Sequence, residues 1–323
     1  MNWKINVLIA ICVMLFSCNS KEKKSTIPQQ VDKVIEEKRT YFNTKHIIEA
    51  NELKIIIGSA NVKVVHFSRP AKYKEGHIAG SVNIWRTDIE ATSYPYKGMM
   101  STKEQLETLF SRLGINTDDT LIIYDAVASC DAARLWWVLD NYGFKNVRIL
   151  NGGIDAWVNE EGKLTTNETI VETTNFVLPK EYAGSLYITK EEMLHEVSGN
   201  SASVILDTRT TDEFTGKRQK KGAKSGGRIP SSRLMDWANC MNYNGDKKFK
   251  EYTKLAAMYE SIISDKDQLV ISYCHSGVRS AHTAFVLTEL LGYKNVKNYD
   301  GSWTEWSHFE DYPKEKDSIT TLL

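Results

Sequence analysis

The stretches Leu121-Ile122-Ile123-Tyr124-Asp125 and Leu269-Val270-Ile271-Ser272-Tyr273 decide the fold, because they are two versions of the same apolar run. Each is followed by a loop and an apolar helical pattern, over residues 132–142 in the first copy and 281–291 in the second. Each pattern stops at a glycine, as helix C-termini commonly do. The copies are roughly 149 residues apart, which is far too long for a solenoid repeat and predicts two duplicated domains.

Earlier segments of the two copies also correspond. Val62–Phe67 and Val204–Asp207 are each short apolar runs of the kind found in buried strands. Gly76-His77-Ile78-Ala79-Gly80-Ser81 in the first copy is echoed by Gly227-Arg228-Ile229-Pro230-Ser231-Ser232 in the second. Short apolar strands that alternate with helices predict an α/β fold, in which each of two tandem domains is a parallel sheet flanked by helices.

The segment Cys274-His275-Ser276-Gly277-Val278-Arg279-Ser280 joins the second apolar run to its helix. The first N–H groups of a helix and its positive dipole end favour negative charge. A nearby cation such as Arg279 also lowers the pKa of a thiol, and the thiolate is the reactive form. A buried structural cysteine is the alternative, since free cysteines often pack as small apolar groups. The segment alone leaves both interpretations open.

Composition narrows the function classes. The chain has 323 residues, with 41 basic and 41 acidic side chains that cancel, so no global field favours nucleic acid as a partner. Its five cysteines form no CxxC pair and its seven histidines are scattered, which argues against a metal site and against a disulfide framework. The apolar fraction is that of an ordinary globular protein.

The N-terminus is predicted to be a targeting signal over residues 1–17. Ile5–Phe16 is an unbroken apolar run, too short to span a bilayer but suitable for a signal-peptide core. Leu15-Phe16-Ser17-Cys18 resembles a bacterial lipoprotein cleavage box, with Cys18 as the lipidated residue. Residues 18–43 are polar and predicted to be a tether. We therefore expect a lipid-anchored protein on the extracytoplasmic (periplasmic) side of a bacterial membrane; an uncleaved anchor and simple secretion are the alternatives.

The ordered motifs of the chain resemble the tandem-domain rhodanese family of sulfurtransferases, of the thiosulfate or 3-mercaptopyruvate type. The motifs that carry this resemblance are Gly76–Ser81, Asp207-Thr208-Arg209, Gly227–Pro230, Cys274–Arg279 and Tyr299-Asp300-Gly301-Ser302-Trp303-Thr304-Glu305-Trp306. The expected division is a first domain over 44–160, a linker over 161–185, a catalytic domain over 186–312 and a tail over 313–323. The resemblance implies a catalytic cysteine in the second domain only, with the first domain forming part of the wall of the site.

The corresponding loop of the first copy supports that asymmetry. Asp125-Ala126-Val127-Ala128-Ser129-Cys130-Asp131 lacks a cysteine directly after the strand, lacks the glycine, and carries acidic residues where a thiolate would need cations. Cys130 is interpreted as a packing residue, with a redox role as the alternative. The first domain is therefore predicted to be catalytically silent.

The resemblance implies a two-step sulfur transfer without a cofactor. Cys274 would take the sulfane sulfur of thiosulfate as a persulfide and pass it to cyanide or a thiol. The loop residues His275, Ser276, Gly277, Val278, Arg279 and Ser280 would bind the substrate. Four residues lie between Cys274 and Arg279, whereas the related phosphatases have five, so a single sulfur suits the loop better than phosphate.

Several features leave the donor open between thiosulfate and 3-mercaptopyruvate. The pair His275-Ser276 lies between the patterns of the two types, and an acidic Glu213 stands where some members have an arginine. Arg209 and Arg228 are candidates for binding the substrate instead. A basic segment over 216–227 is either a solvated loop or a border of the site that attracts anions. A non-catalytic rhodanese-like module that binds a partner or carries sulfur is the alternative from another class.

Overall fold

The computed structural model describes residues 40–180, 185–199 and 201–317. The expected signal over 1–17, the expected lipidated Cys18 and the tether up to residue 39 lie outside the described residues. The described residues all belong to one compact unit, 38–323. No helix within that described part is both long and apolar enough to cross a membrane.

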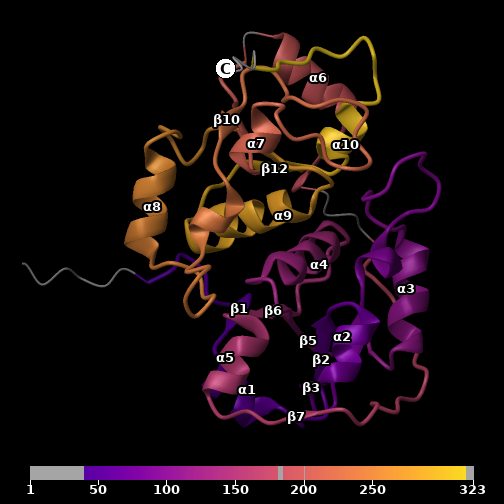
Figure 1. The fold of residues 1–323 in the computed structure, drawn as a ribbon. Helices are drawn as coiled ribbons and strands as arrows, with labels where there is room; N and C mark the ends of the chain where they lie inside the picture. Colours follow the sequence, from indigo (N-terminus) through magenta and orange to yellow (C-terminus); the bar gives the residue numbers. More distant parts are fainter. Residues whose placement is uncertain (1–39, 181–184, 200, 318–323) are drawn as a thin grey trace, which may run out of the picture. The chain divides into compact units, whose positions relative to one another are not determined.

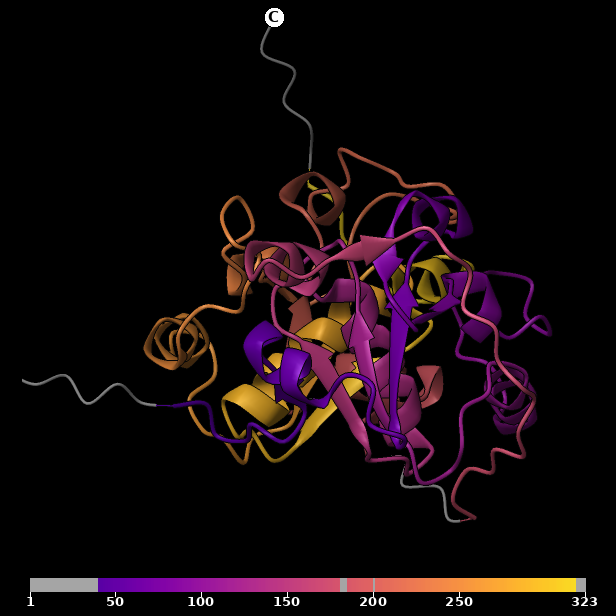
Figure 2. The ribbon, with the colours of Figure 1, turned by 90° about the horizontal axis from the view of Figure 1, so that it is seen from below.

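Two five-stranded parallel sheets confirm the predicted α/β fold. The first has the order β1-β6-β5-β2-β4, formed by Ile47–Ile48, Val147–Leu150, Thr120–Tyr124, Val62–Phe67 and Val82–Ile84. Figure 2 shows these strands side by side, coloured indigo to magenta. A separate antiparallel pair joins β3 (His77–Ile78) to β7 (Leu164–Thr165).

The second sheet repeats the topology of the first. Its order is β10-β9-β11-β12-β8, formed by Arg233–Leu234, Val204–Asp207, Val270–Tyr273, Val296–Tyr299 and Tyr187–Ile188. The two copies of the apolar run, β5 and β11, are the central strand of their sheets. The carboxyl ends of parallel strands are where α/β folds place their ligands, so the loops after β5 and β11 occupy equivalent positions.

Helices follow the strands in both halves (Figure 1). Those of the first half are α1 (Ala50–Ile56), α2 (Pro70–Glu75), the 3-10 turn η1 (Arg86–Ile89), α3 (Lys103–Arg112), α4 (Cys130–Asn141) and α5 (Gly153–Asn159). Those of the second are α6 (Lys190–Ser198), α7 (Thr211–Phe214), the 3-10 turn η2 (Trp237–Cys240), α8 (Tyr252–Glu260), α9 (Val278–Phe285), the π-helical turn η3 (Val286–Leu290) and α10 (Ser302–Trp306).

The two halves share one hydrophobic core through α4 and α9. These two helices contact each other (Figure 1), and Trp136 of α4 meets Phe285 of α9 edge-on with ring centroids 4.9 Å apart. Alternation along β5 explains the layering: Ile123 faces this shared core, whereas Ile122 faces the cluster under α1 and α5. The loops that precede α4 and α9 are therefore held close to the junction of the halves.

The expected linker over 161–185 contains buried residues. Phe176 packs against Phe110 and Phe144, with ring centroids 5.0 and 5.4 Å away. The backbone N–H of Thr174 donates to the carbonyl of Ser111. At the other end of the first half, Phe42 N donates to the carbonyl of Leu290. The segments that flank the first sheet are thus packed against the domains they connect.

Candidate active site

Cys274 lies directly after β11 and before the first turn of α9, and its side chain is 1% exposed. Gly277 makes the turn between them with φ of 74°, in the left-handed region that favours glycine. A Cβ built on Gly277 would lie 2.7 Å from the carbonyl oxygen of Asp300 and 2.9 Å from Nη1 of Arg134. The turn therefore needs glycine both for its backbone angle and for its space.

The start of α10 fixes the backbone of the cysteine loop. Ser302 Oγ accepts hydrogen bonds from the N–H groups of Cys274 and Gly277 at 3.1 and 3.0 Å, and donates to the carbonyl of Tyr299. Trp303 N donates to the carbonyl of Cys274 and Thr304 N to that of His275. The sequence motif over 299–306 did not predict a role for Ser302, because nothing in the chain order places it beside residue 274.

The environment of Cys274 favours its thiolate. Burial by itself raises the pKa of the thiol, but the charge of Arg279 and hydrogen bonds from Ser280 and Ser276 bring that pKa down to about 7. By contrast, burial raises the pKa of Cys240 to about 12.

Arg279 is occupied by Glu213 of α7. Its Nη1 and Nη2 donate to the two carboxylate oxygens at 2.7 and 2.8 Å. Burial by itself raises the pKa of Glu213. The hydrogen bonds and the positive charge of Arg279 outweigh this effect and lower the pKa to about 2. The pair therefore stays ionised at neutral pH. Arg279 acts on Cys274 through its charge, while the two nitrogens of its guanidinium group that donate in parallel are bound to Glu213.

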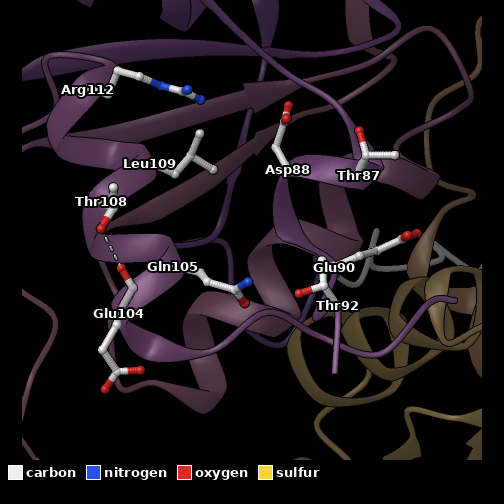
Figure 3. Close-up of a pocket in the computed structure, with 9 residues that line it drawn as sticks. All are labelled: Thr87, Asp88, Glu90, Thr92, Glu104, Gln105, Thr108, Leu109 and Arg112. Carbon is white, nitrogen blue, oxygen red and sulfur yellow. Dashed lines mark hydrogen bonds between the residues drawn. The ribbon is translucent and has the colours of Figure 1, made fainter. Parts of the chain in front are cut away.

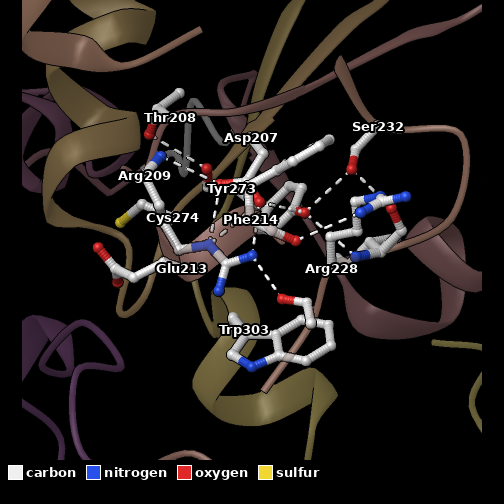
Figure 4. Close-up of polar contacts among 12 residues, drawn as sticks. Asp207, Thr208, Arg209, Glu213, Phe214, Arg228, Ser232, Tyr273, Cys274 and Trp303 are labelled. Atoms are coloured by element: carbon white, nitrogen blue, oxygen red, sulfur yellow. Dashed lines mark hydrogen bonds and ion pairs between the residues drawn. The ribbon is translucent and has the colours of Figure 1, made fainter. Parts of the chain in front are cut away.

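Arg209 and Arg228, the two other candidates for substrate binding, also hold carboxylates. Figure 4 shows Arg209 beside Asp207. Arg209 is 2% exposed; its guanidinium binds both oxygens of Asp207 and the carbonyl of Gly227. Arg228 pairs with Glu315 at 3.1 Å and Asp317 at 2.6 Å in the C-terminal segment. Both guanidinium groups thus have protein partners.

His275 holds the basic segment 216–227 against the cysteine loop. Its Nε2 lies 3.0 Å from the carbonyl oxygen of Lys221, so this nitrogen carries the proton of the neutral ring. Burial and the nearby Lys220 charge lower the pKa of His275 to about 4, which makes it neutral at physiological pH. Trp303 Nε1 donates to the carbonyl of Ser225 at 2.8 Å and fixes the segment at a second point.

The first half contributes Arg134 of α4 to the loop. This residue is 2% exposed, and its Nη1 donates to Asp300 at 2.5 Å and to the carbonyl of Gly277 at 3.4 Å. Its Nη2 donates to the carbonyl of Gly98 at 2.8 Å. The other oxygen of Asp300 accepts from the N–H of Met100. Arg134 therefore links the cysteine loop to the segment of the first half that contains Gly98 and Met100.

The equivalent loop of the first half is filled by its own carboxylate. Asp125 stands directly after β5, and its two oxygens accept N–H bonds from Val127, Ser129, Asp131 and Ala132 at 2.8–3.0 Å. Burial raises the pKa of this carboxyl and the four N–H groups lower it, with burial the larger effect. The N–H groups that could face a bound anion are thus occupied from within, in keeping with a silent first domain.

A cleft of about 710 Å³ opens beside the cysteine loop. We call it the lysine cleft. Its walls come from Glu90 and residues 95–98 of the first half, from 221–224 of the basic segment, and from His275, Ser276, Thr304 and His308. A second pocket, of about 410 Å³, lies between η1 and α3 (Figure 3). Its lining has neither cysteine nor histidine, and no group of three metal-binding side chains occurs in the part of the chain that the structure describes.

Comparison with known proteins places this geometry in context. The model of the rhodanese-like domain matches the chain twice, over residues 49–160 and 189–309. A thiosulfate sulfurtransferase of Corynebacterium glutamicum is 33% identical over 85% of this chain and 92% of its own length. The sulfur carrier protein TtuD of Thermus thermophilus is 33% identical over 76% of this chain and 87% of its own length.

Solved structures agree in fold. The anaerobic ergothioneine biosynthesis enzyme from Chlorobium limicola, solved with trimethyl histidine, superposes with a TM-score of 0.73 at 20% identity. The superposition covers 86% of this chain and 72% of that one. At this level of identity the likeness concerns the arrangement of the two α/β halves.

Proposed function

Because this chain belongs to the rhodanese family, we propose that it transfers the sulfane sulfur of thiosulfate to cyanide or a thiol through a persulfide on Cys274. The observation that carries the proposal is a buried thiol with a pKa of about 7, set against N–H groups at the start of α9. The named activity of the relative from Corynebacterium glutamicum supports thiosulfate as donor.

The chemistry follows from this arrangement. The Cys274 thiolate attacks the outer sulfur of thiosulfate, the S–S bond of the donor breaks, and its electron pair leaves with sulfite. In the second step, an acceptor nucleophile takes the outer sulfur and the Cys274 thiolate is regenerated. Arg279 and the N–H groups of the loop stabilise the negative sulfur both in the thiolate and in the persulfide of Cys274.

Lys220 is the cation that we assign to the donor's oxygens. The nearby arginines are paired with carboxylates, whereas the ammonium group of Lys220 makes no hydrogen bond or ion pair with another residue that the structure describes. Burial and the charge of Arg279 lower the pKa of Lys220, while the charges of Glu213 and then of the Cys274 thiolate raise it, so Lys220 interacts electrostatically with the catalytic loop. Lys220→Ala is expected to raise the KM for thiosulfate.

The decisive experiment incubates the soluble domain with thiosulfate and cyanide and measures thiocyanate. Wild type and Cys240→Ser should form it, because Cys240 is a buried thiol with a raised pKa, and Cys274→Ser should not. Equal thiocyanate from Cys274→Ser would overturn the proposal. A parallel assay with 3-mercaptopyruvate tests the other donor.

A sulfur-carrier role is the second candidate, favoured by the name of the relative from Thermus thermophilus. A carrier would load Cys274 with sulfur but turn over slowly with small acceptors. Mass spectrometry of the thiosulfate-treated protein, compared with steady-state thiocyanate formation, separates the two roles.

We also propose that the mature chain is anchored through a lipid on Cys18 and faces the extracytoplasmic side of a bacterial membrane. The apolar run over 5–16 followed by Ser17-Cys18 supports this. Partitioning of the full-length chain into detergent should disappear in Cys18→Ala. A wild type that stays in the aqueous phase would count against the anchor.

A further inference from the structure

The sulfur of Cys274 is closed off in the structure. The residue is 1% exposed and does not line the lysine cleft, although its neighbours His275 and Ser276 do. A molecule in the cleft therefore reaches the cysteine loop but not Sγ itself. Part of the wall has to move before Sγ can react with a molecule from solution.

The wall that the basic segment forms is held at several points. Trp303 Nε1 donates to the carbonyl of Ser225 at 2.8 Å. The N–H of Lys224 donates to Ser307 Oγ at 3.0 Å, and the ring of His275 binds the same segment. This wall is fixed to the second half, so it is not the part that moves most easily.

The opposite wall is a loop of the first half with a fixed stem and a loosely held tip. Ala91 N donates to the carbonyl of Met99 at 2.9 Å and closes the stem, and Arg134 binds the carbonyl of Gly98 at 2.8 Å. The backbone groups of the tip, residues 92–97, make no hydrogen bond with any residue that the structure describes. The position of the tip therefore depends on its side chains.

Tyr96 holds the tip to the second half. Its hydroxyl donates to Oε1 of Glu305 in α10 at 2.5 Å, and its ring lies against His308 with centroids 5.3 Å apart. Burial raises the pKa of Tyr96 and the hydrogen bond to Glu305 raises it further, so the phenol keeps its proton. Burial raises the pKa of Glu305, and the bond from Tyr96 counteracts that rise. The bond thus stabilises the carboxylate and is charge-assisted.

This bond ends on the element that supports the cysteine loop. The carboxylate of Glu305 packs directly against Gly301, at the turn into α10. The next residue, Ser302, binds the N–H groups of Cys274 and Gly277. Figure 1 shows the loop before α3, coloured purple, extending to α10. Tyr96 therefore connects the tip to the support of the reactive thiol.

The end of the tip lies on the cysteine loop. A Cβ added to Gly98 would lie 2.6 Å from Cβ of Ser276 and 3.2 Å from its carbonyl oxygen. Gly98 has a φ of 105°, and both it and Ala91 are small residues, as hinges often are. A tip that turns on these two residues widens the lysine cleft beside Ser276.

We propose that residues 92–97 are a lid on the path to Cys274 and that Tyr96 is the positioning residue that holds the lid closed through Glu305. Breaking the bond lets the tip turn on its stem, and larger molecules then reach Sγ. The inference rests on the proposed function only in that Cys274 is the reacting thiol.

Two reagents with the same reactive group test the lid. Iodoacetamide is small, whereas 5-iodoacetamidofluorescein carries the same group on a bulky dye. The full-length chain is treated with each, and modification of Cys274 is followed by mass spectrometry of its peptide. Tyr96→Phe should raise the ratio of the bulky-reagent rate to the iodoacetamide rate about tenfold, because it removes a hydrogen bond to a charged group.

Tyr94→Phe is the matched control. Tyr94 lies in the same tip and is 43% exposed, and its hydroxyl makes no hydrogen bond with another described residue, so the ratio should stay at the wild-type value. Glu305→Gln weakens the acceptor from the other half and should raise the ratio as Tyr96→Phe does. It decides the question even if Tyr96→Phe fails to fold.

Limited digestion with trypsin distinguishes an open lid from a general loss of stability. In Tyr96→Phe the bond after Lys97 should be cut several-fold faster than in the wild type. The bond after Lys221, in the fixed basic segment, should be cut at the wild-type rate. Equal acceleration at both bonds would overturn the assignment of Tyr96.

The outcomes separate the lid from the proposed function. An unchanged alkylation ratio in Tyr96→Phe and Glu305→Gln, or the same rise in Tyr94→Phe, would overturn the lid and leave sulfur transfer untouched. A chain that forms no thiocyanate but shows the expected ratios would lose the proposed function and keep the lid.

Discussion

Replacing Arg134 by methionine tests how strongly the first half supports the cysteine loop of the second half. Methionine keeps part of the apolar stem but removes the guanidinium, which leaves Asp300 fully buried with only the N–H of Met100 as a donor. Removal of one partner of a buried ion pair costs about 3–5 kcal/mol, because the other charge stays buried. The carbonyls of Gly98 and Gly277 lose donors in the same step.

We expect Arg134→Met to lose about 3–5 kcal/mol of the free energy of unfolding, measured in urea. Arg148→Met is the matched control, since Arg148 pairs with the exposed Glu52 at 3.4 Å and donates to the carbonyl of Ile47 at 2.9 Å. An exposed pair contributes about 0–1 kcal/mol and a hydrogen bond about 1 kcal/mol, so the control should lose at most about 2 kcal/mol. Adding Asp300→Asn to Arg134→Met should recover part of the loss, because the uncompensated charge is gone.

Sulfur loading supplies a second measurement for the same variant. The Gly277 carbonyl keeps Asn298 as its remaining side-chain donor, so the cysteine loop is held less firmly and the rate of persulfide formation should fall. A loss of less than 1 kcal/mol together with an unchanged loading rate would refute the idea that the first half positions the loop through Arg134.

Three further results are expected. The rate of alkylation of Cys274 by iodoacetamide should rise with pH around a midpoint near 7, because the thiolate reacts and the pKa of this thiol is lowered to about 7. His275, whose pKa is lowered to about 4, should add no inflection above pH 5. A midpoint near 9 would contradict this prediction. Gly277→Ala should greatly reduce sulfur loading, because the added Cβ is crowded. Gly80 has a similar φ of 78° but nothing within 4 Å of an added Cβ, so Gly80→Ala should cost only about 1–2 kcal/mol of stability. Equal effects of the two substitutions on sulfur loading would show that crowding at Gly277 is irrelevant. Asp125→Asn should lose about 1–3 kcal/mol in urea unfolding yet still load one sulfur per chain, and a loss of loading would argue that the first loop takes part in chemistry.

The duplicated apolar runs were sufficient to predict the architecture. They became β5 and β11, the central strands of two sheets with the same order, because a buried parallel strand needs a continuous apolar sequence. The glycine at 277 also predicted where the chain turns sharply into a helix. The first loop makes a similar left-handed turn without glycine, through Ala128 and Ser129, and the sequence did not predict this. Local patterns of this kind carry their physical cause within a few residues.

Contacts between distant residues could not be predicted in the same way. Arg209, Arg228 and Arg279 look equivalent in the sequence as anion binders, but each meets a carboxylate, and the partners of Arg228 and Arg279 lie more than 60 residues away. The expected linker hides Phe176, whose burial depends on Phe110 and Phe144. Such partnerships depend on tertiary packing, which a single sequence does not display.

The loop at Asp125, whose N–H groups are bound by its own carboxylate, has a consequence for the rigidity of the protein during turnover. In the proposed reaction, the loop at Cys274 in the second half accommodates a sulfur that alternates between thiolate and persulfide. In the first half, the same kind of loop keeps its four hydrogen bonds whatever the substrate does. One copy of the duplicated domain therefore behaves as a permanently occupied site, and it lends the working copy a neighbour whose shape does not change with each reaction cycle.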